Sequence, residues 1–176
     1  MKDKTSGNRK NIKLIVFFVC WTFFVVLATS YVWAVITDPN NRAVLGTESK
    51  RPLIEYINEL RASKSLQLLR TDPQLTKSAQ QKADDLAAQN YFDHIMPNGK
   101  APIDYMQPEH PGLKTYGENL AKCYPDNKSA FDAFVAPPKH YANIVLPEYT
   151  LFGSATTYDK DQHCYIIVNH FGAERS

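Results

Sequence analysis

The chain has 176 residues, which is enough for one domain with a hydrophobic core plus an appended segment. Apolar residues make up 44% and charged residues 22%, as in an ordinary globular protein. The net charge of +2 is unevenly distributed, because residues 1–13 carry +4 and the remainder carries −2. A mildly acidic body gives no indication of nucleic-acid binding, so the sequence argues against nucleic acid as a partner.

An uncharged run of 23 residues, 14–36, follows the basic tail. As a helix it would be about 34 Å long, enough to cross a bilayer core of about 30 Å. The positive-inside rule then places residues 1–13 in the cytoplasm and the rest outside. We expect an uncleaved, single-pass signal anchor in the cell membrane, followed by a linker over 37–50. A signal peptide cleaved near Ala28-Thr29-Ser30 is the alternative, and it leaves the domain on the same side.

Two helices are expected next. Over residues 52–62 the apolar side chains form one stripe, and Arg61 is assigned to the solvent side with two glutamates. Asp72 followed by Pro73 is typical of a helix start, and helical spacing of leucine and alanine continues to about residue 91.

The middle of the chain predicts shorter elements. Residues 102–106 indicate one helical turn, and residues 107–115, with two prolines and a glycine, indicate a loop. The tripeptide Gly117-Glu118-Asn119 is expected at a strand edge or at the entry to a turn.

The last third predicts a helix and a hairpin. Asn127 is the expected cap of a helix that runs to about residue 135 and is ended by Pro137-Pro138. Residues 150–158 and 164–171 are rich in β-branched and aromatic side chains, so they predict a β-hairpin.

Three residues are candidates for a common site: His94, Glu118 and His140. The separations along the chain are 24 and 22 residues, and each residue lies at the expected end of an element, where binding residues are often displayed. Each is weak evidence alone, because a single histidine is more often structural. Two imidazoles and a carboxylate together are reasonable ligands for Zn²⁺ or another divalent metal. The alternative is a cleft in which Glu118 only hydrogen-bonds the two histidines.

The exported part contains two cysteines, Cys123 and Cys164, on the side of the membrane where disulfides persist. Two cysteines allow one intramolecular pairing, so we expect this disulfide. Two buried free thiols are the alternative. The third cysteine, Cys20, lies inside the apolar run.

Residues of about 50–172 resemble the CAP superfamily, also called SCP domains, in its compact bacterial extracytoplasmic form. Four stretches match in order. They are Ile57-Asn58-Glu59-Leu60-Arg61, Ala79 to His94, Tyr116-Gly117-Glu118-Asn119-Leu120-Ala121, and His140-Tyr141-Ala142-Asn143-Ile144 followed by Phe171-Gly172. The resemblance implies an α+β domain over residues 51–173, an α-β-α sandwich with a cleft of two histidines and two acids.

His94, Glu118 and His140 match three of those four cleft residues. The fourth has no counterpart, since Phe134 stands where many animal members have a tryptophan and no acid follows it before Pro137. Asp132 and Glu148 are the acids that remain open for this place.

Two functions therefore remain. The first is a membrane-tethered module that binds an unknown lipid, peptide or cell-envelope ligand in a cleft able to hold a divalent metal. The second is a metal-dependent extracellular hydrolase. The missing fourth acid favours the module. No Gly-x-Ser-x-Gly context surrounds Ser129 or Ser154, and no His-Glu-x-x-His motif is present.

Overall fold

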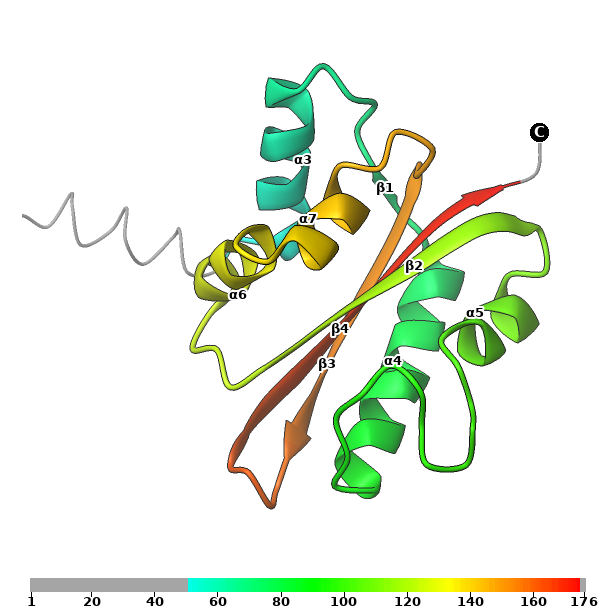
Figure 1. Ribbon diagram of the computed structural model, residues 1–176, viewed down its shortest axis with the longest axis vertical. Helices are drawn as coiled ribbons and strands as arrows, with labels where there is room; N and C mark the ends of the chain where they lie inside the picture. Colours follow the sequence, from blue (N-terminus) through cyan, green and yellow to red (C-terminus); the bar gives the residue numbers. More distant parts are fainter. Residues whose placement is uncertain (1–50, 175–176) are drawn as a thin grey trace, which may run out of the picture. The chain divides into compact units, whose positions relative to one another are not determined.

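Four strands form one mixed sheet with helices on both faces (Figure 1). The computed structural model describes residues 51–174, so the predicted tail, transmembrane segment and linker lie outside the described part. The helices are α3 (Leu53–Ser63), α4 (Pro73–Ala88), α5 (Ile103–Glu109), α6 (Asn127–Val135) and α7 (Pro138–Ile144). The strands are β1 (Arg70–Thr71), β2 (Leu113–Lys122), β3 (Leu151–Asp159) and β4 (Cys164–Glu174). None of these helices is long and apolar enough to span a bilayer.

The sheet has the order β1-β3-β4-β2. The short β1 pairs in parallel with β3, and the predicted hairpin β3–β4 pairs antiparallel along its whole length. β2 pairs antiparallel with β4, so residues about fifty positions apart face each other across two neighbouring strands. Since β4 lies inside the sheet between β2 and β3, its side chains are covered on both faces.

Successive side chains on the strands point to opposite faces of the sheet, and each face packs against its own layer of helices. One face packs under α3, α6 and α7 through side chains such as Phe152, Ile167 and Phe171. The other packs against α4 through Leu120, Ala155 and Val168. Together with Figure 1, this gives the α-β-α layering that the sequence predicted.

The start of α4 is as predicted, because the Asp72 side chain accepts a hydrogen bond of 2.7 Å from the backbone N–H of Leu75. The helix ends at Ala88, about three residues earlier than expected. Its N-terminal turn lies directly on β3, where a Cβ at Gly153 would overlap the backbone of Leu75 and Thr76. Glycine is therefore required here by close packing.

Arg61 differs from the prediction. Its side chain is fully buried, and its guanidinium donates to the carbonyl oxygens of Ile144, Leu146 and Tyr149 at 2.8–2.9 Å and to that of Gln67 at 2.8 Å. Arg61 lies one turn after Ile57 on the same face of α3, so its position in the helix predicts a buried side chain. The expected place in solvent rested on its charge. Burial lowers the pKa of Arg61, but four carbonyl acceptors compensate the guanidinium.

Three local predictions are wrong in detail. The Gly117-Glu118-Asn119 segment lies within β2, because pairing with β4 extends it beyond the local turn signal. Residues 103–109 form a helix that includes Pro108. The cap of α6 is Asp126, whose side chain accepts from Ser129 N–H, one residue earlier than expected.

A further helix, α7, was not predicted. Pro138 occupies its first turn, a position that proline favours because the missing N–H has no intrahelical partner there. The Pro137-Pro138 pair therefore ends α6 and begins α7. As a result His140 lies inside a helix and not in a loop after one.

Candidate functional site

Glu118 lies in β2 with its carboxylate buried between the sheet and the α4 layer. The residue before it, Gly117, leaves room for Tyr149 and Asn143, which a Cβ would overlap. Asn143 donates a hydrogen bond of 3.0 Å to the backbone carbonyl of Glu118 and one of 2.8 Å to Asn119 Oδ1. The Gly-Glu-Asn sequence therefore locks this point of β2 to α7 from the opposite face.

Two imidazoles hold the two carboxylate oxygens of Glu118. His94 Nδ1 lies 2.7 Å from Oε1, and His170 Nε2 lies 3.1 Å from Oε2. Burial alone would raise the pKa of Glu118, but hydrogen bonds from His170 and His94 keep that pKa below its ordinary value. Glu118 is therefore an ionised carboxylate with an imidazole on each oxygen.

His170 was not among the candidates from the sequence. It lies on β4 directly opposite Glu118, and its side chain is fully buried. Burial lowers the pKa of His170, so this ring is neutral. One signal could have found it: Asn169-His170 is a polar pair inside the otherwise apolar run from Ile166 to Phe171.

His94 follows α4 in the loop at residues 89–102, and its side chain is 47% exposed. The buried Lys82 of α4 donates to the carbonyl oxygens of Asp93 at 3.0 Å and His94 at 2.8 Å, which fixes this part of the loop. The hydrogen bond that His94 donates to Glu118 raises the pKa of His94, against the opposing effect of burial. Because Nδ1 faces Glu118, the free ring nitrogen of His94 is Nε2.

His140 approaches from α7. Asn119 donates to its backbone carbonyl at 3.0 Å, and its ring packs edge-on against Phe134 with centroids 5.6 Å apart. The ring nitrogen Nδ1 is buried without a hydrogen-bond partner. Burial lowers the pKa of His140, and the positive charge of His94 lowers it further. Within residues 51–174, His140 makes no hydrogen bond to Glu118.

A cavity of about 210 Å³ lies beside His140. Its wall is largely apolar and aromatic, with Phe92 and Phe134, and it carries one cation, Lys122, whose Nζ lies 4.9 Å from the Phe92 ring centroid. The cavity therefore combines an apolar wall with a few polar groups, and it is smaller than the roughly 300–1,000 Å³ of typical small-ligand sites.

A metal could use only part of the predicted ligand set. Within the described residues, no three or more His, Cys, Asp and Glu side chains are arranged to hold an ion. Both Glu118 oxygens face imidazoles, so within the described residues Nε2 of His94 and the two ring nitrogens of His140 are the donors still open. A carboxylate that orients a histidine from behind is a common arrangement at metal sites, and Glu118 fits that part.

In the described part of the chain, the two acids left open for the fourth place make no hydrogen bond or ion pair with the site histidines. Asp132 on α6 pairs with Lys128 at 2.7 Å, and its side chain is 59% exposed. Glu148 is exposed in the segment before β3.

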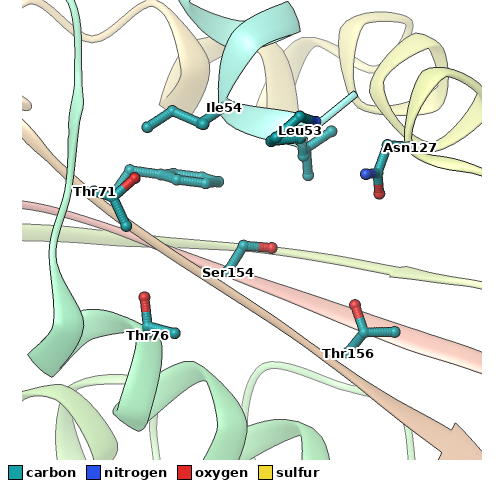
Figure 2. A pocket seen from close by; sticks show the side chains of 9 residues that line it. Leu53, Ile54, Thr71, Thr76, Asn127, Ser154 and Thr156 are labelled. Carbon is teal, nitrogen blue, oxygen red and sulfur yellow. The ribbon is translucent and has the colours of Figure 1, made fainter. Parts of the chain in front are cut away.

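A second cavity, of about 300 Å³, lies between the start of α3 and the start of α4 (Figure 2). Its labelled lining includes Leu53 and Ile54 above, Thr76 below and Ser154 on β3. None of its lining residues is a histidine or an acid, so Ser154 has no base beside it for nucleophilic chemistry.

The predicted disulfide is confirmed. Cys123 directly follows β2 and Cys164 begins β4, with a Cα–Cα distance of 4.9 Å. The bond therefore joins the same two strands that carry Glu118 and His170.

Comparison with known proteins agrees with this architecture. YkwD of Bacillus subtilis (strain 168), an uncharacterized protein, is 34% identical over 104 residues, which are 59% of this chain and 40% of YkwD. YlbC of the same organism, an uncharacterized membrane protein, is 24% identical over 107 residues, 61% of this chain and 31% of YlbC. The chain thus spans less than half the length of either relative.

Solved structures show the same fold. An outer surface protein from Borrelia burgdorferi superposes with a TM-score of 0.66 at 23% identity, over 73% of this chain and 94% of the Borrelia chain. An extracellular SCP-domain protein from Bacillus anthracis str. Ames gives 0.62 at 25% identity, over 69% and 39%. NaASP2, whose crystal structure is described with Zn²⁺, gives 0.50 at 16% identity, over 72% and 84%.

The family model for cysteine-rich secretory proteins matches residues 54–171, which is most of the chain and includes His94, Glu118, His140 and His170. Both the sequence motifs and the fold therefore assign this chain to the CAP family of cysteine-rich secretory proteins.

Proposed function

We propose that the chain is a membrane-tethered, extracytoplasmic CAP module that binds a ligand in the cleft between His94 and His140, with a divalent metal held by the two imidazoles. The observation that carries the proposal is that His140, a residue lining the adjacent cavity, has a buried Nδ1 without a hydrogen-bond partner. A buried polar atom without a partner costs free energy, so its persistence in this position fits a site that is completed by something outside the chain.

His94 supplies the second donor. Glu118 accepts from Nδ1, which turns Nε2 away from the carboxylate, and Lys82 fixes the backbone beneath the ring. Two imidazoles and water give Zn²⁺ an incomplete protein ligand set, so we expect weak binding that leaves positions for a ligand carboxylate or carbonyl. Since the CAP fold of NaASP2 has been described with Zn²⁺, Zn²⁺ is the first metal to test.

The described residues favour binding over hydrolysis. If the two imidazoles hold the metal, a hydrolase needs a further group, such as a carboxylate, that is free to activate water or a nucleophile. Here both oxygens of Glu118 are engaged, and the serine nearest to this cluster, Ser78, is fully buried. The metal-dependent hydrolase therefore remains the second candidate, without an observation in its favour.

The tether is supported by the uncharged run 14–36 and the basic tail before it. The relative YlbC is called a membrane protein, and the Bacillus anthracis SCP-domain protein is called extracellular. These names support the proposed location of the present domain outside the cell.

Zn²⁺ binding to the fragment 38–176, prepared without a histidine tag, tests the proposal. We expect Zn²⁺ to raise the melting temperature at pH 7, by an amount equivalent to about 2.7 kcal/mol at a hundredfold excess over Kd. The effect should fade below about pH 6, because metal-binding imidazoles must be neutral. His94→Ala and His140→Ala should abolish it while the fold persists.

The matched control is His163→Ala, which removes an exposed histidine in the β3–β4 turn. This variant should retain the full response to Zn²⁺. Equal responses in His94→Ala, His140→Ala and the wild type would exclude the proposed metal site.

A further inference from the structure

A chain of buried polar side chains runs from α4 along the adjacent face of the sheet to the site. Ser78 Oγ lies 2.8 Å from His170 Nδ1, His170 Nε2 lies 3.1 Å from Glu118 Oε2, and Glu118 Oε1 lies 2.7 Å from His94 Nδ1. Ser78 and His170 are fully buried and Glu118 nearly so, whereas His94 reaches solvent. Only the last member of the chain can therefore touch a ligand.

The proton positions follow from this order. His170 Nε2 faces an ionised carboxylate, so it carries the hydrogen, and its neutral ring then has an acceptor lone pair at Nδ1. The Ser78 hydroxyl also lies 2.9 Å from Leu75 O, but its one hydrogen is directed to Nδ1, which has no other donor in range. Every member is thus satisfied when His170 is the Nε2–H tautomer and His94 is the Nδ1–H tautomer.

We propose that His170, anchored by Ser78, is a positioning residue for the ligand site: it holds the Glu118 carboxylate in the orientation that fixes the His94 ring with Nε2 facing outward. Without His170, Oε2 of Glu118 would be a buried anionic oxygen with no donor, and the carboxylate would turn to share its one remaining partner. The proposal rests on the function proposed above, since it assigns His94 Nε2 to metal and ligand.

A second anchor on α4 supports this geometry. Lys82 lies one helical turn after Ser78 on the same buried face, and it holds the carbonyls of Asp93 and His94. One face of α4 therefore fixes both sides of Glu118, through His170 on one oxygen and the His94 backbone on the other. A polar cluster that served only the stability of the fold would not need both Glu118 and Lys82 to fix the exposed His94, one at its ring and the other at its backbone carbonyl.

The nucleophilic alternative for this chain of residues fails on access. A serine, a histidine and a carboxylate in hydrogen-bonded order also occur in hydrolases, where the serine must contact the substrate. Ser78 and His170 have no exposed surface, so no substrate can reach either atom. Among the four residues, only His94 is exposed enough to contact a ligand.

Two amide substitutions separate the roles of the two ring nitrogens. The side-chain nitrogen of Gln is as far along its chain as Nε2 of His, so His170→Gln keeps a donor for Glu118. Asn is one methylene shorter, so His170→Asn can reach Ser78 but not Glu118. Both are neutral and similar in polarity, which makes them matched variants.

The first readout is Zn²⁺ affinity of the full-length chain in detergent, without a histidine tag. Loss of a residue that orients a metal-binding histidine typically weakens binding by about 10- to 100-fold. We expect a loss in that range for His170→Asn, and a change of less than about threefold for His170→Gln. Equal affinities for wild type and His170→Asn, or equal losses in both variants, would overturn the proposal.

The second readout needs no metal. Ring ¹⁵N chemical shifts of the apo protein at about pH 9, above the usual range of histidine pKa values, report which nitrogen carries the hydrogen. We expect Nε2–H for His170 and Nδ1–H for His94 in wild type, and a shift of His94 toward Nε2–H in His170→Asn. Either wild-type ring in the opposite tautomer refutes the positioning role, even if a variant does not fold. If wild type binds no Zn²⁺ but shows these tautomers, the metal site fails and the positioning role stands.

Discussion

Arg61→Met should be among the most destabilising single substitutions in the domain. The guanidinium donates to four carbonyl oxygens, and two of these hydrogen bonds, to Ile144 at 2.8 Å and Tyr149 at 2.9 Å, are buried. Methionine approximates the aliphatic stem but offers no donor. Both carbonyls would then be buried without a partner, since Ile144 ends α7 and Tyr149 precedes β3.

Each buried acceptor left unpaired costs about 1–3 kcal/mol, so the two together cost about 2–6 kcal/mol. The bonds to Gln67 and Leu146 are only partly buried, and water can replace them at little cost. Removing the charge recovers some of its desolvation free energy, which places the expected loss in the lower half of that range. Against a typical domain stability of about 5–15 kcal/mol, this is a large fraction.

Urea denaturation of the fragment 38–176, followed by tyrosine near-ultraviolet circular dichroism, would measure the change. The control is Arg70→Met, because Arg70 and its partner Glu174 have side chains that are 61% and 53% exposed, and such pairs contribute less than about 1 kcal/mol. Arg61→Lys should lie between wild type and Arg61→Met, as one ammonium cannot reach four carbonyls. A loss below about 1 kcal/mol for Arg61→Met would refute the argument from buried carbonyls.

Three further predictions follow from other parts of the chain. Without reduction, only Cys20 should react with an alkylating agent after denaturation, and ready labelling of Cys123 or Cys164 would contradict this. Replacing both Cys123 and Cys164 by Ala should lower the free energy of unfolding by about 4 kcal/mol, because the disulfide closes a loop of 41 residues. Burial lowers the pKa of His170 from 6.5, so the stability contributed by its neutral ring should be complete above pH 6.5 and decline as pH falls below that value. If His170→Gln left the pH dependence of the unfolding free energy unchanged, the lowered pKa of His170 would be refuted. Protease added to intact cells should digest the domain and spare residues 1–13, whereas a soluble form that begins near Tyr31 would show that the segment 14–36 is cleaved.

The first two helices and the hairpin could be predicted because their signals are local. The Asp72-Pro73 start of α4 and the alternation of the hairpin each depend on a few neighbouring residues. The disulfide could also be predicted, since the two cysteines of the domain permit one pairing. The ordered motifs of the CAP family then joined these elements into one architecture.

The errors have non-local causes. Arg61 was assigned to solvent by its charge, yet its acceptors come mostly from residues 144–149, more than eighty positions away. Gly117 was interpreted as a turn residue, but its lack of a side chain serves the close approach of Tyr149 to β2. Neither contact leaves a trace in the neighbouring sequence.

The candidate site shows the same division. The motifs identified His94 and Glu118, which the structure joins by a hydrogen bond, and His140, whose place as a ligand remains a prediction. His170 was missed because its importance depends on strand register: only the pairing of β2 with β4 places it opposite Glu118. A histidine within an apolar strand is usually a satisfied core residue, so its type alone gave no reason to select it.

Strand register therefore links the stability of the fold to the chemistry of the site. Successive side chains on a strand point to opposite faces, so a slip of one residue between β2 and β4 would move Glu118 or His170 to the other face of the sheet. The disulfide between Cys123 and Cys164 lies at one end of this strand pair, and the bonds from Asn143 to the backbone of Glu118 and to Asn119 secure its middle. These anchors hold the buried Glu118 carboxylate between the imidazoles of His170 and His94, on the face of the sheet that α4 covers. The His94 ring is thereby held with Nε2 outward, and His140 on α7 supplies the second imidazole of the proposed site.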